Sequence, residues 1–304
     1  MEYILETQNL EKKYKKVKAV DNLSMHIQKG AIYGLIGRNG AGKTTLIRLI
    51  CGLQKPTSGT YTIFNIPNTD KKIIKARKRM GAIVETPSIW LDATAEDNLK
   101  EQYKVVGLPN YDNLNEILKL VNLAETGNKK AKNFSLGMKQ RLGIAIALVG
   151  NPDILILDEP INGLDPEGII QIRELILKLN KEKGITFLIS SHYLDELSKI
   201  ATHYGFVNKG KIIQEISKQD LEQKCKRKIE IKVSNEKECV KYLEEKGIQY
   251  EVISDKIINI YDKMNVSELA IALSNRNCVI DEFQEKEESL ENYYINLIGG
   301  GENV

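Results

Sequence analysis

The sequence predicts an α/β protein in which a parallel sheet is interrupted by a mostly helical insertion and is followed by a smaller α+β domain. Short apolar runs of strand length, at residues 31–36, 154–157 and 185–189, are separated by segments whose apolar residues have helical spacing. A glycine-rich turn at residues 37–45 joins the first of these runs to a helix. After Ser217 the pattern changes to short alternating strands and short helices. We therefore expect two folded regions of different architecture.

Composition indicates one large or two smaller soluble domains, because the chain has 304 residues of which 28% are charged. The 44 basic and 41 acidic residues are too evenly balanced to favour nucleic acid as a partner. Cys51, Cys225, Cys239 and Cys278 lack metal-ligand spacing, so we expect reduced core thiols in a cytoplasmic protein. The polar N-terminus does not resemble a signal peptide, and no apolar run approaches the ~20 residues of a membrane helix. Any action at a membrane is therefore expected to go through partner proteins.

The first part of the chain has a regular order of predicted strands and helices. Strand patterns occur at residues 4–10, 17–27, 59–64 and 81–84. The polar stretch from about residue 94 to residue 149 is helical in character, and Thr94 with Asp97 predicts a capping box near its start. The periodic helix at residues 169–179 then restores the alternation of strand and helix.

The glycine-rich turn fits the phosphate-loop pattern, with glycines, a lysine and a threonine at the required spacing. A strand that leads into such a turn and then into a helix forms an anion site, because unpaired backbone N–H groups and the positive helix end point at the phosphates. We expect Lys43 to hold the terminal phosphates of a nucleotide and the Thr44 hydroxyl to ligate Mg²⁺. The predicted nucleotide-binding residues of this loop are Gly37, Arg38, Asn39, Gly40, Ala41, Gly42, Lys43, Thr44 and Thr45.

The apolar run at residues 154–157 ends in two carboxylates, Asp158 and Glu159. A buried strand with this ending delivers Asp158 to the Mg²⁺ shell and places Glu159 where it polarises a water molecule against the γ-phosphate. Alone the pattern is weak, because many core strands end in an acid. It gains weight here because it follows a phosphate loop on the same chain.

The C-terminal region predicts a small ferredoxin-like domain. Residues 229–233 alternate apolar and polar, and Asn235 with Glu238 predicts a capped helix that Gly247 ends. Strands at 248–253 and 257–261, a helix at 266–273 and a strand at 279–283 complete a βαββαβ order, and a last helix carries Leu290, Tyr293, Tyr294 and Leu297. We expect a first domain at residues 1–216 with its helical part at about 86–150, a second at 217–298 and a flexible tail at 299–304.

Three further segments lie around the acidic strand in a fixed order. They are Ser135-Leu136-Gly137-Met138-Lys139-Gln140-Arg141, Asn162-Gly163-Leu164-Asp165-Pro166 and Ser190-Ser191-His192. With the phosphate loop, this set resembles the ATP-binding subunit of ABC transporters over residues 1 to about 215. Leu136 and Met138 depart from the family's LSGGQ signature, whereas Ser135 and Gly137 match it. The resemblance implies an ABC ATPase cassette with a parallel core sheet, antiparallel N-terminal strands and a helical insertion.

The resemblance also implies ATP and Mg²⁺ as cofactors and assigns roles to single residues. Two chains would pack head to tail as an ATP-dependent homodimer, in which Ser135 and Gly137 contact the ATP of the opposite subunit and Asp165 contacts the partner. Ser135 also suits an ordinary helix N-cap, and Asp165 suits a turn. His192 would reach the γ-phosphate as a catalytic residue. Tyr14 would lie against adenine, with a half-buried strand tyrosine as the alternative.

One position departs from the family pattern in an informative way. Residues 80–87 match the segment that carries the family's Q-loop glutamine, but this chain has Glu85 there. A glutamine donates and accepts hydrogen bonds, whereas an ionised glutamate only accepts. Glu85 and the divergent signature resemble the bacitracin and lantibiotic-immunity exporter subfamily. We expect Glu85 near Mg²⁺, as a metal ligand or catalytic residue, and residues 87–97 as a coupling surface in which Trp90 is either an anchor or a buried tryptophan.

The favoured interpretation is an ATPase that drives a separately encoded transmembrane exporter of a peptide antibiotic, located at the cytoplasmic face of the membrane. An alternative is export of another substrate, such as a lipid, a glycan or a drug. A third is a soluble ABC protein of translation, chromosome handling or iron–sulfur assembly. The single cassette, the lack of a heptad array and the added C-terminal domain count against this third class.

Overall fold

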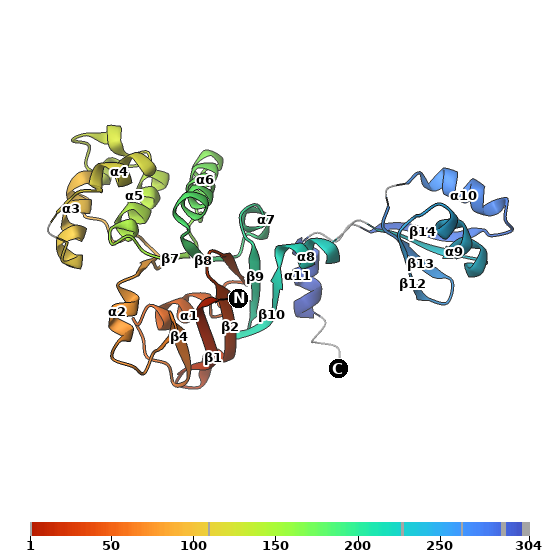
Figure 1. Ribbon diagram of the computed structural model, residues 1–304, viewed down its shortest axis with the longest axis horizontal. Coiled ribbons are helices and arrows are strands. Elements are labelled where there is room, and N and C mark those ends of the chain that lie inside the picture. Colours follow the sequence, from red (N-terminus) through yellow and green to blue (C-terminus); the bar gives the residue numbers. More distant parts are fainter. Residues whose placement is uncertain (1, 109, 226–227, 263, 287–289, 300–304) are drawn as a thin grey trace. The chain divides into compact units, whose positions relative to one another are not determined.

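The computed structural model describes residues 2–108, 110–225, 228–262, 264–286 and 290–299 (Figure 1). The chain divides into two compact units, Met1–Lys218 and Gln219–Val304, which we call the N-terminal and C-terminal units. Of the tail that the sequence predicts at 299–304, residues 300–304 lie outside the described residues. Each unit has its own sheet or sheets and its own hydrophobic core, and the two are described separately.

The larger sheet of the N-terminal unit has the strand order β10-β9-β3-β8-β7-β6. Its strands are β3 (Ile32–Ile36), β6 (Met80–Ile83), β7 (Ile154–Asp158), β8 (Thr186–Ser191), β9 (His203–Asn208) and β10 (Lys211–Ser217). All neighbouring pairs are parallel except the β9–β10 hairpin. Every residue of β3, β7 and β8 is buried, as is usual for central strands of a parallel sheet. The predicted parallel core sheet is confirmed.

The sequence reading missed the β9–β10 hairpin, although a turn signal is present. Lys209 and Gly210 both have positive φ, at 47° and 79°, between Asn208 and Lys211, which pair with each other. Two consecutive residues with positive φ are the mark of a type I′ hairpin turn. The hairpin returns the chain antiparallel to β9 at the edge of the sheet.

A second, antiparallel sheet with the order β2-β1-β4-β5 packs on helix α1 in the N-terminal unit. It consists of β1 (Tyr3–Tyr14), β2 (Val17–Gln28), β4 (Ser58–Ile63) and β5 (Ile66–Pro67). Leu5, Leu23 and Ile63 from this sheet share one core with Leu46 and Ile47 of α1 (Lys43–Ile50). The antiparallel N-terminal strands are therefore confirmed. The phosphate-loop helix α1 packs against this sheet and also contacts β7.

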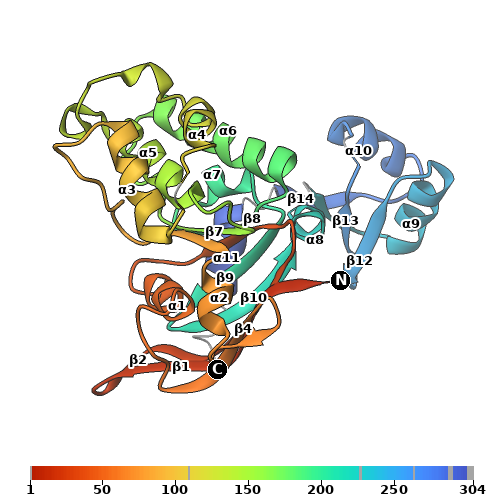
Figure 2. The same ribbon diagram turned by 60° about the vertical axis from the view of Figure 1, so that its left-hand side comes forward.

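The helical part of the N-terminal unit gathers α3, α4 and α5 beside the larger sheet, as both ribbon views show (Figure 2). Its elements are α3 (Ala95–Val106), α4 (Leu114–Leu120), η1 (Ala124–Thr126), η2 (Ala131–Asn133) and α5 (Leu136–Leu148). The predicted capping box of Thr94 and Asp97 is present at the start of α3. The remaining helices are α2 (Ile73–Arg77), α6 (Pro166–Lys183) and α7 (Leu194–Ser198).

The C-terminal unit has an antiparallel sheet with the strand order β12-β13-β11-β14. Its elements are α8 (Lys218–Lys224), β11 (Lys228–Val233), α9 (Glu236–Glu245), β12 (Tyr250–Ser254), β13 (Ile257–Ile260), α10 (Val266–Ser274), β14 (Ile280–Lys286) and α11 (Leu290–Gly299). The order and connections between β11 and β14 are those of a ferredoxin-like fold, as predicted. Ile231, Leu243 and Leu273 are fully buried between the sheet and its helices.

Two expectations about single side chains need correction. Trp90 is 61% exposed, so the alternative of a buried tryptophan is wrong, because its segment runs over the surface before α3. All four cysteines are free, as expected, but only Cys239 and Cys278 are fully buried. Burial raises the pKa of the Cys239 thiol to about 12.

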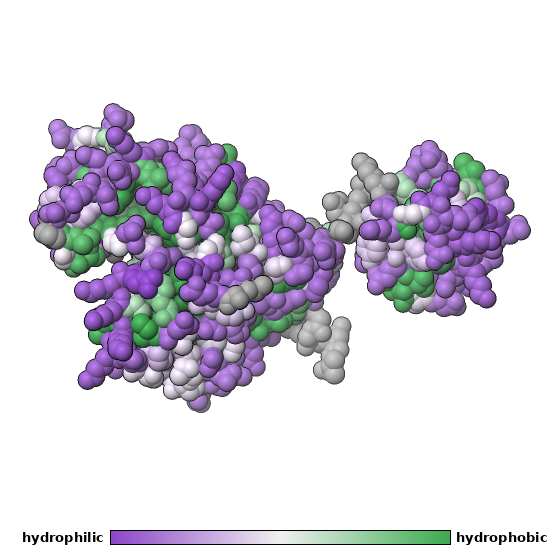
Figure 3. Space-filling view, in the orientation of Figure 1, coloured by the Kyte–Doolittle hydropathy of each residue, from purple (hydrophilic) through white to green (hydrophobic). Residues whose placement is uncertain are grey.

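The face shown in Figure 3 is mostly hydrophilic with scattered apolar patches. No helix in the described part of the chain is long and apolar enough to cross a bilayer.

Candidate nucleotide-binding site

The phosphate loop lies at the carboxyl end of β3, where Ile36 pairs with Ser191 of β8. The loop turns into α1 through Gly42, which has φ 107°, a value that favours glycine. A Cβ at Gly42 would lie 2.2 Å from the carbonyl oxygen of Ala19, so a larger residue would force the loop open. Helix α1 therefore begins at Lys43 with its free N–H groups facing the loop, which is the geometry that binds phosphate.

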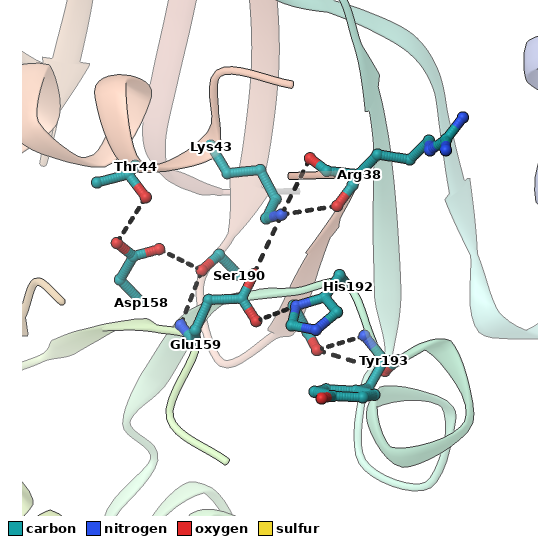
Figure 4. Close-up of polar contacts among 10 residues, drawn as sticks. Arg38, Lys43, Thr44, Asp158, Glu159, Ser190, His192 and Tyr193 are labelled. Atoms are coloured by element: carbon teal, nitrogen blue, oxygen red, sulfur yellow. Dashed lines mark hydrogen bonds and ion pairs between the residues drawn. The ribbon is translucent and has the colours of Figure 1, made fainter. Parts of the chain in front are cut away.

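Lys43 folds back over the loop that precedes it (Figure 4). Its Nζ donates a hydrogen bond to the Gly37 carbonyl oxygen at 2.6 Å and lies 3.1 Å from Oε1 of Glu159. The side chain is only 6% exposed. A buried ammonium at a helix N-terminus makes the loop strongly attractive to an anion such as a polyphosphate.

Thr44 and Asp158 bring two oxygen atoms together from different elements. The Thr44 hydroxyl of α1 donates to Oδ2 of Asp158 at 2.8 Å, and the Ser190 hydroxyl of β8 donates to Oδ1 of the same carboxylate at 2.5 Å. Asp158 is 2% exposed and is held in place by both bonds. Hydroxyl and carboxylate oxygens suit Mg²⁺, so Thr44 and Asp158 fit the ion. No cluster of three or more His, Cys, Asp or Glu that could hold a metal occurs among the described residues.

Glu159 lies between Lys43 and His192 (Figure 4). Its Oε2 is 2.8 Å from Nδ1 of His192, and its backbone N–H donates to the Ser190 hydroxyl at 2.9 Å. The backbone of Glu159 has φ 50°, which is uncommon for a residue with a side chain and typical of functional positions. This turn directs the carboxylate back over the end of β7 toward the loop.

Two residues that shape this cluster had no role assigned from the sequence, although Ser190 lies in one of the segments named there. Ser190 bridges the ends of β7 and β8, and the ring of Tyr193 packs against His192 with centroids 4.0 Å apart and ring planes tilted by 39°. Their signal in the sequence was position alone, because both lie at or just after the carboxyl end of β8, beside the acidic end of β7. The structure thus brings Lys43, Asp158 and Glu159 together with the residues that follow β8.

The remaining predicted residues of the phosphate loop surround Lys43. Arg38, Asn39 and Gly40 are exposed at the loop tip, whereas Ala41 is 6% exposed and its carbonyl oxygen accepts a hydrogen bond from the Gly210 N–H. Thr45 lies half-buried in the first turn of α1. The exposed tip leaves the backbone of the loop open to a ligand.

Four predicted residues lie outside this polar cluster. Tyr14 is 41% exposed, and its hydroxyl donates to the side chain of Gln54. Ser135 caps α5 by accepting from the Met138 N–H at 3.2 Å, and Gly137 lies buried in the first turn of that helix. Asp165 caps α6 by accepting from the Gly168 N–H at 3.0 Å. The interpretation of Ser135 as a helix N-cap is confirmed, and Asp165 proves to be a cap as well.

Glu85 follows β6 and does not contact Thr44 or Asp158. Its Oε1 lies 2.6 Å from Nη2 of Arg48 on α1, and its backbone has φ 64°. The segment that follows packs tightly on α5, where a Cβ at Gly143 would lie 2.6 Å from Cβ of Pro87.

Comparison with known proteins agrees with this geometry. The ABC transporter family matches residues 20–162. The bacitracin transport ATP-binding protein BcrA of Bacillus licheniformis is 41% identical over 306 residues, which cover 99% of each chain. BcrA of Enterococcus faecalis is 39% identical over 303 residues, covering 99% of this chain and 98% of that protein. The lantibiotic transport ATP-binding protein SrtF of Streptococcus pyogenes is 43% identical over 215 residues, covering 70% of this chain and 90% of that protein.

Solved structures give the same result for the fold. A dimeric ATP-binding cassette in a post-hydrolysis state with ADP and Pi has a TM-score of 0.63 and 28% identity, covering 70% of this chain and 98% of that one. The cbiO1 subunit of an ABC transporter complex from Clostridium perfringens has a TM-score of 0.66 and 28% identity, covering 81% of this chain and 96% of that one.

Proposed function

The chain belongs to the ATP-binding subunits of ABC transporters, which are ATPases, and from this premise we propose that it drives the export of a peptide antibiotic of the bacitracin or lantibiotic type. The observation that carries the proposal is the similarity to the bacitracin transport proteins over 99% of this chain, which includes the C-terminal unit. A relative of the cassette alone would match only the N-terminal unit. We therefore favour a peptide substrate over a lipid, a glycan or another drug.

The polar cluster supports a hydrolytic role for specific residues. We propose that Lys43 binds the terminal phosphates of ATP and thereby leaves Glu159, whose Oε1 it contacts in this structure at 3.1 Å. Glu159 then accepts a proton from the water that attacks the γ-phosphorus, the bond from that phosphorus to the bridging oxygen breaks, and ADP and phosphate leave. His192 orients the Glu159 carboxylate from 2.8 Å. Mg²⁺, held by Thr44 and Asp158, neutralises phosphate charge when bound.

ATP-binding subunits of this family work as dimers with separate transmembrane subunits. We propose a head-to-tail homodimer in which Ser135 and Gly137 face the ATP of the opposite chain, Asp165 contacts the partner and Tyr14 lies against adenine. Ser135 and the N-terminus of α5 support this role, because a helix start presents N–H groups to a phosphate. The dimer would lie at the cytoplasmic face of the membrane, bound to its transmembrane partners.

We propose that the C-terminal unit is an accessory domain that does not contact nucleotide. Its described residues hold one ferredoxin-like body with a separate core, and its sequence carries no phosphate-binding motif. A chain that stops after Lys218 should therefore bind ATP with an affinity within about two-fold of the full chain, because all phosphate contacts remain. Equilibrium binding of a fluorescent ATP analogue measures this, and a large loss in a folded truncated chain would contradict the proposal.

The decisive experiment uses Glu159→Gln in Gram-positive cells that carry the cognate transmembrane subunits. This variant keeps the size of the side chain but removes the proton acceptor, so resistance to the peptide antibiotic should disappear while ATP binding is kept. Purified Glu159→Gln should elute as a dimer in gel filtration with ATP. Glu182→Gln on the exposed end of α6 is the matched control and should behave as wild type. ATP hydrolysis at the wild-type rate in Glu159→Gln would contradict the catalytic role. An active ATPase whose loss leaves peptide resistance unchanged would instead contradict the substrate.

A further inference from the structure

Arg48 and Glu85 form an ion pair on the helix that carries Thr44, one of the candidate metal-binding residues. Nη2 of Arg48 lies 2.6 Å from Oε1 of Glu85, and the two side chains are 34% and 59% exposed. Arg48 belongs to the last turn of α1, the helix that begins at the phosphate loop. Glu85 follows β6, the edge strand next to β7. The pair therefore connects the two elements that flank Asp158.

The position of Arg48 on α1 relates the pair directly to Thr44. Residues four apart in an α-helix lie on one face, with Cβ atoms about 5–6 Å from each other. Thr44 and Arg48 have this spacing, so the Thr44 hydroxyl and the Arg48 guanidinium occupy successive turns of the same face. The Glu85 carboxylate is thus bound one helical turn beyond the Thr44–Asp158 hydrogen bond.

The sheet register places the backbone of Glu85 at the same edge as Asp158. Ile83 of β6 pairs with Leu157 of β7, so Glu85 and Glu159 each come two residues after paired positions. Both glutamates have a left-handed backbone, with φ 64° and 50°. Each of these neighbouring parallel strands is thus followed by a glutamate with a left-handed backbone, whose carboxylate contacts a basic residue of α1.

We propose that Arg48 is a positioning residue that holds Glu85 away from the metal-binding oxygens, and that breaking this ion pair lets Glu85 join them. This inference rests on the proposed function, because it assumes that Thr44 and Asp158 hold Mg²⁺ beside ATP. Glu85 would then add a second carboxylate to the ion beside that of Asp158, and Arg48 offsets the charge of Glu85 while the ion pair is intact. An exposed ion pair of this kind is weak, so a small force on the segment after Glu85 changes its state.

The test is a titration of Mn²⁺ into the full-length protein with a non-hydrolysable ATP analogue. Trp90 is the single tryptophan of the chain, lies five residues after Glu85 and is 61% exposed, so its fluorescence reports the segment in question. Arg48→Gln should increase the affinity for Mn²⁺ about two- to five-fold, the range expected from loss of a weak competing ion pair. It should also shift the emission of Trp90. Arg48→Lys, which keeps the charge, should stay closer to wild type.

A double substitution and a matched control separate positioning from general structural effects. In a Glu85→Gln background, Arg48→Gln should have no further effect on Mn²⁺ affinity, because the competing carboxylate is gone. Arg79→Gln is the control. Arg79 pairs with Asp153 at 2.7 Å, and both side chains are partly exposed. This pair lies at the amino ends of β6 and β7, away from Glu85. It should leave both Mn²⁺ affinity and Trp90 emission unchanged.

Unchanged or weaker Mn²⁺ binding in Arg48→Gln would overturn the proposal, as would an equal increase in the Glu85→Gln background. In either case the wild-type chain would still bind Mn²⁺ with nucleotide, so the proposed function would stand. Failure of the wild-type chain to bind the ion with nucleotide would overturn the proposed function and this inference with it.

Discussion

The two units of the chain differ in where their buried polar side chains lie, although each contains one buried side-chain atom without a hydrogen-bond partner, Nε of Arg77 and Oδ1 of Asn259, among the described residues. In the N-terminal unit, Lys43, Asp158 and Ser190 are buried, and each has a partner from another element. In the C-terminal unit, Asn259 is 1% exposed, and its Oδ1 has no hydrogen-bond partner among the described residues. The ion pairs of this unit, such as Lys232–Glu282, lie at the exposed surface.

Strand direction explains much of this difference. The carboxyl ends of parallel strands meet at one edge of a sheet, so β3, β7 and β8 deliver the phosphate loop, the two acids and the Ser190–His192 segment to one place. In the antiparallel sheet of the C-terminal unit, neighbouring strands end at opposite edges. Polar groups at strand ends are then separated by the length of the sheet. A polar cluster of the catalytic kind is therefore expected in the first unit and not in the second.

Removal of the buried ammonium group of Lys43 should have the largest effect of the changes that compare the two units. Lys43→Ala should weaken MgATP binding about 100-fold or more, because charge-assisted hydrogen bonds to phosphate are lost at a desolvated site. Lys237→Ala, at an exposed position on α9 in the C-terminal unit, should leave the affinity unchanged. Isothermal titration with an ATP analogue measures both variants. Tight binding by a folded Lys43→Ala chain would refute the assignment of the phosphate site.

Equivalent core deletions should show whether the units are stabilised separately. Ile156 of β7 and Ile231 of β11 are both fully buried, and truncation of either to alanine should cost about 2–5 kcal/mol in the stability of its own unit. Trp90 reports only the N-terminal unit, whereas circular dichroism reports both. In urea, Ile156→Ala should shift the fluorescence transition, and Ile231→Ala should shift only the dichroism. A shift of the Trp90 transition by Ile231→Ala would show that the units unfold together.

Helix caps provide a subtler comparison, because both units use the same local chemistry. Ser135 caps α5 and Asn235 caps α9, so replacement of either by alanine should cost about 1 kcal/mol in stability. Only Ser135→Ala should also prevent the ATP-dependent dimer of the Glu159→Gln variant. Gel filtration with ATP distinguishes the two. If the double variant Ser135→Ala, Glu159→Gln still formed the dimer, Ser135 would have only the structural role of a helix cap.

The smallest expected difference is in pH dependence. Burial lowers the pKa of His203 in the N-terminal unit below its ordinary value of 6.5, so the unfolded chain binds this proton more readily. The stability of that unit is then complete above about pH 6.5 and decreases as the pH falls below it. The chain has three histidines, all before residue 218, so the C-terminal unit lacks this dependence. The Trp90 transition in urea should move to lower urea on acidification to about pH 5.5, and His203→Gln should reduce that movement. An identical slope in His203→Gln would assign the dependence to other groups.

Features that depend on neighbouring residues were predictable from the sequence alone. The phosphate loop, the acid-ended strand, the capping box at Thr94 and the cap at Asn235 are all confirmed as local structures. The order of these patterns was sufficient to predict the parallel sheet and the ferredoxin-like unit. Each pattern is written within a few residues and needs only backbone geometry to form.

Tertiary structure decided the features that join distant parts of the chain. The bond from Ser190 to Asp158, the contact of His192 with Glu159 and the exposure of Trp90 follow from strand register and packing. The pairing of Glu85 with Arg48 is of the same kind, because it depends on which face of α1 meets the end of β6. The sequence by itself thus determined which chemical groups the chain carries and in what order. Only the tertiary structure decided which of them touch, because side-chain partners are set by contacts between segments that no local pattern encodes.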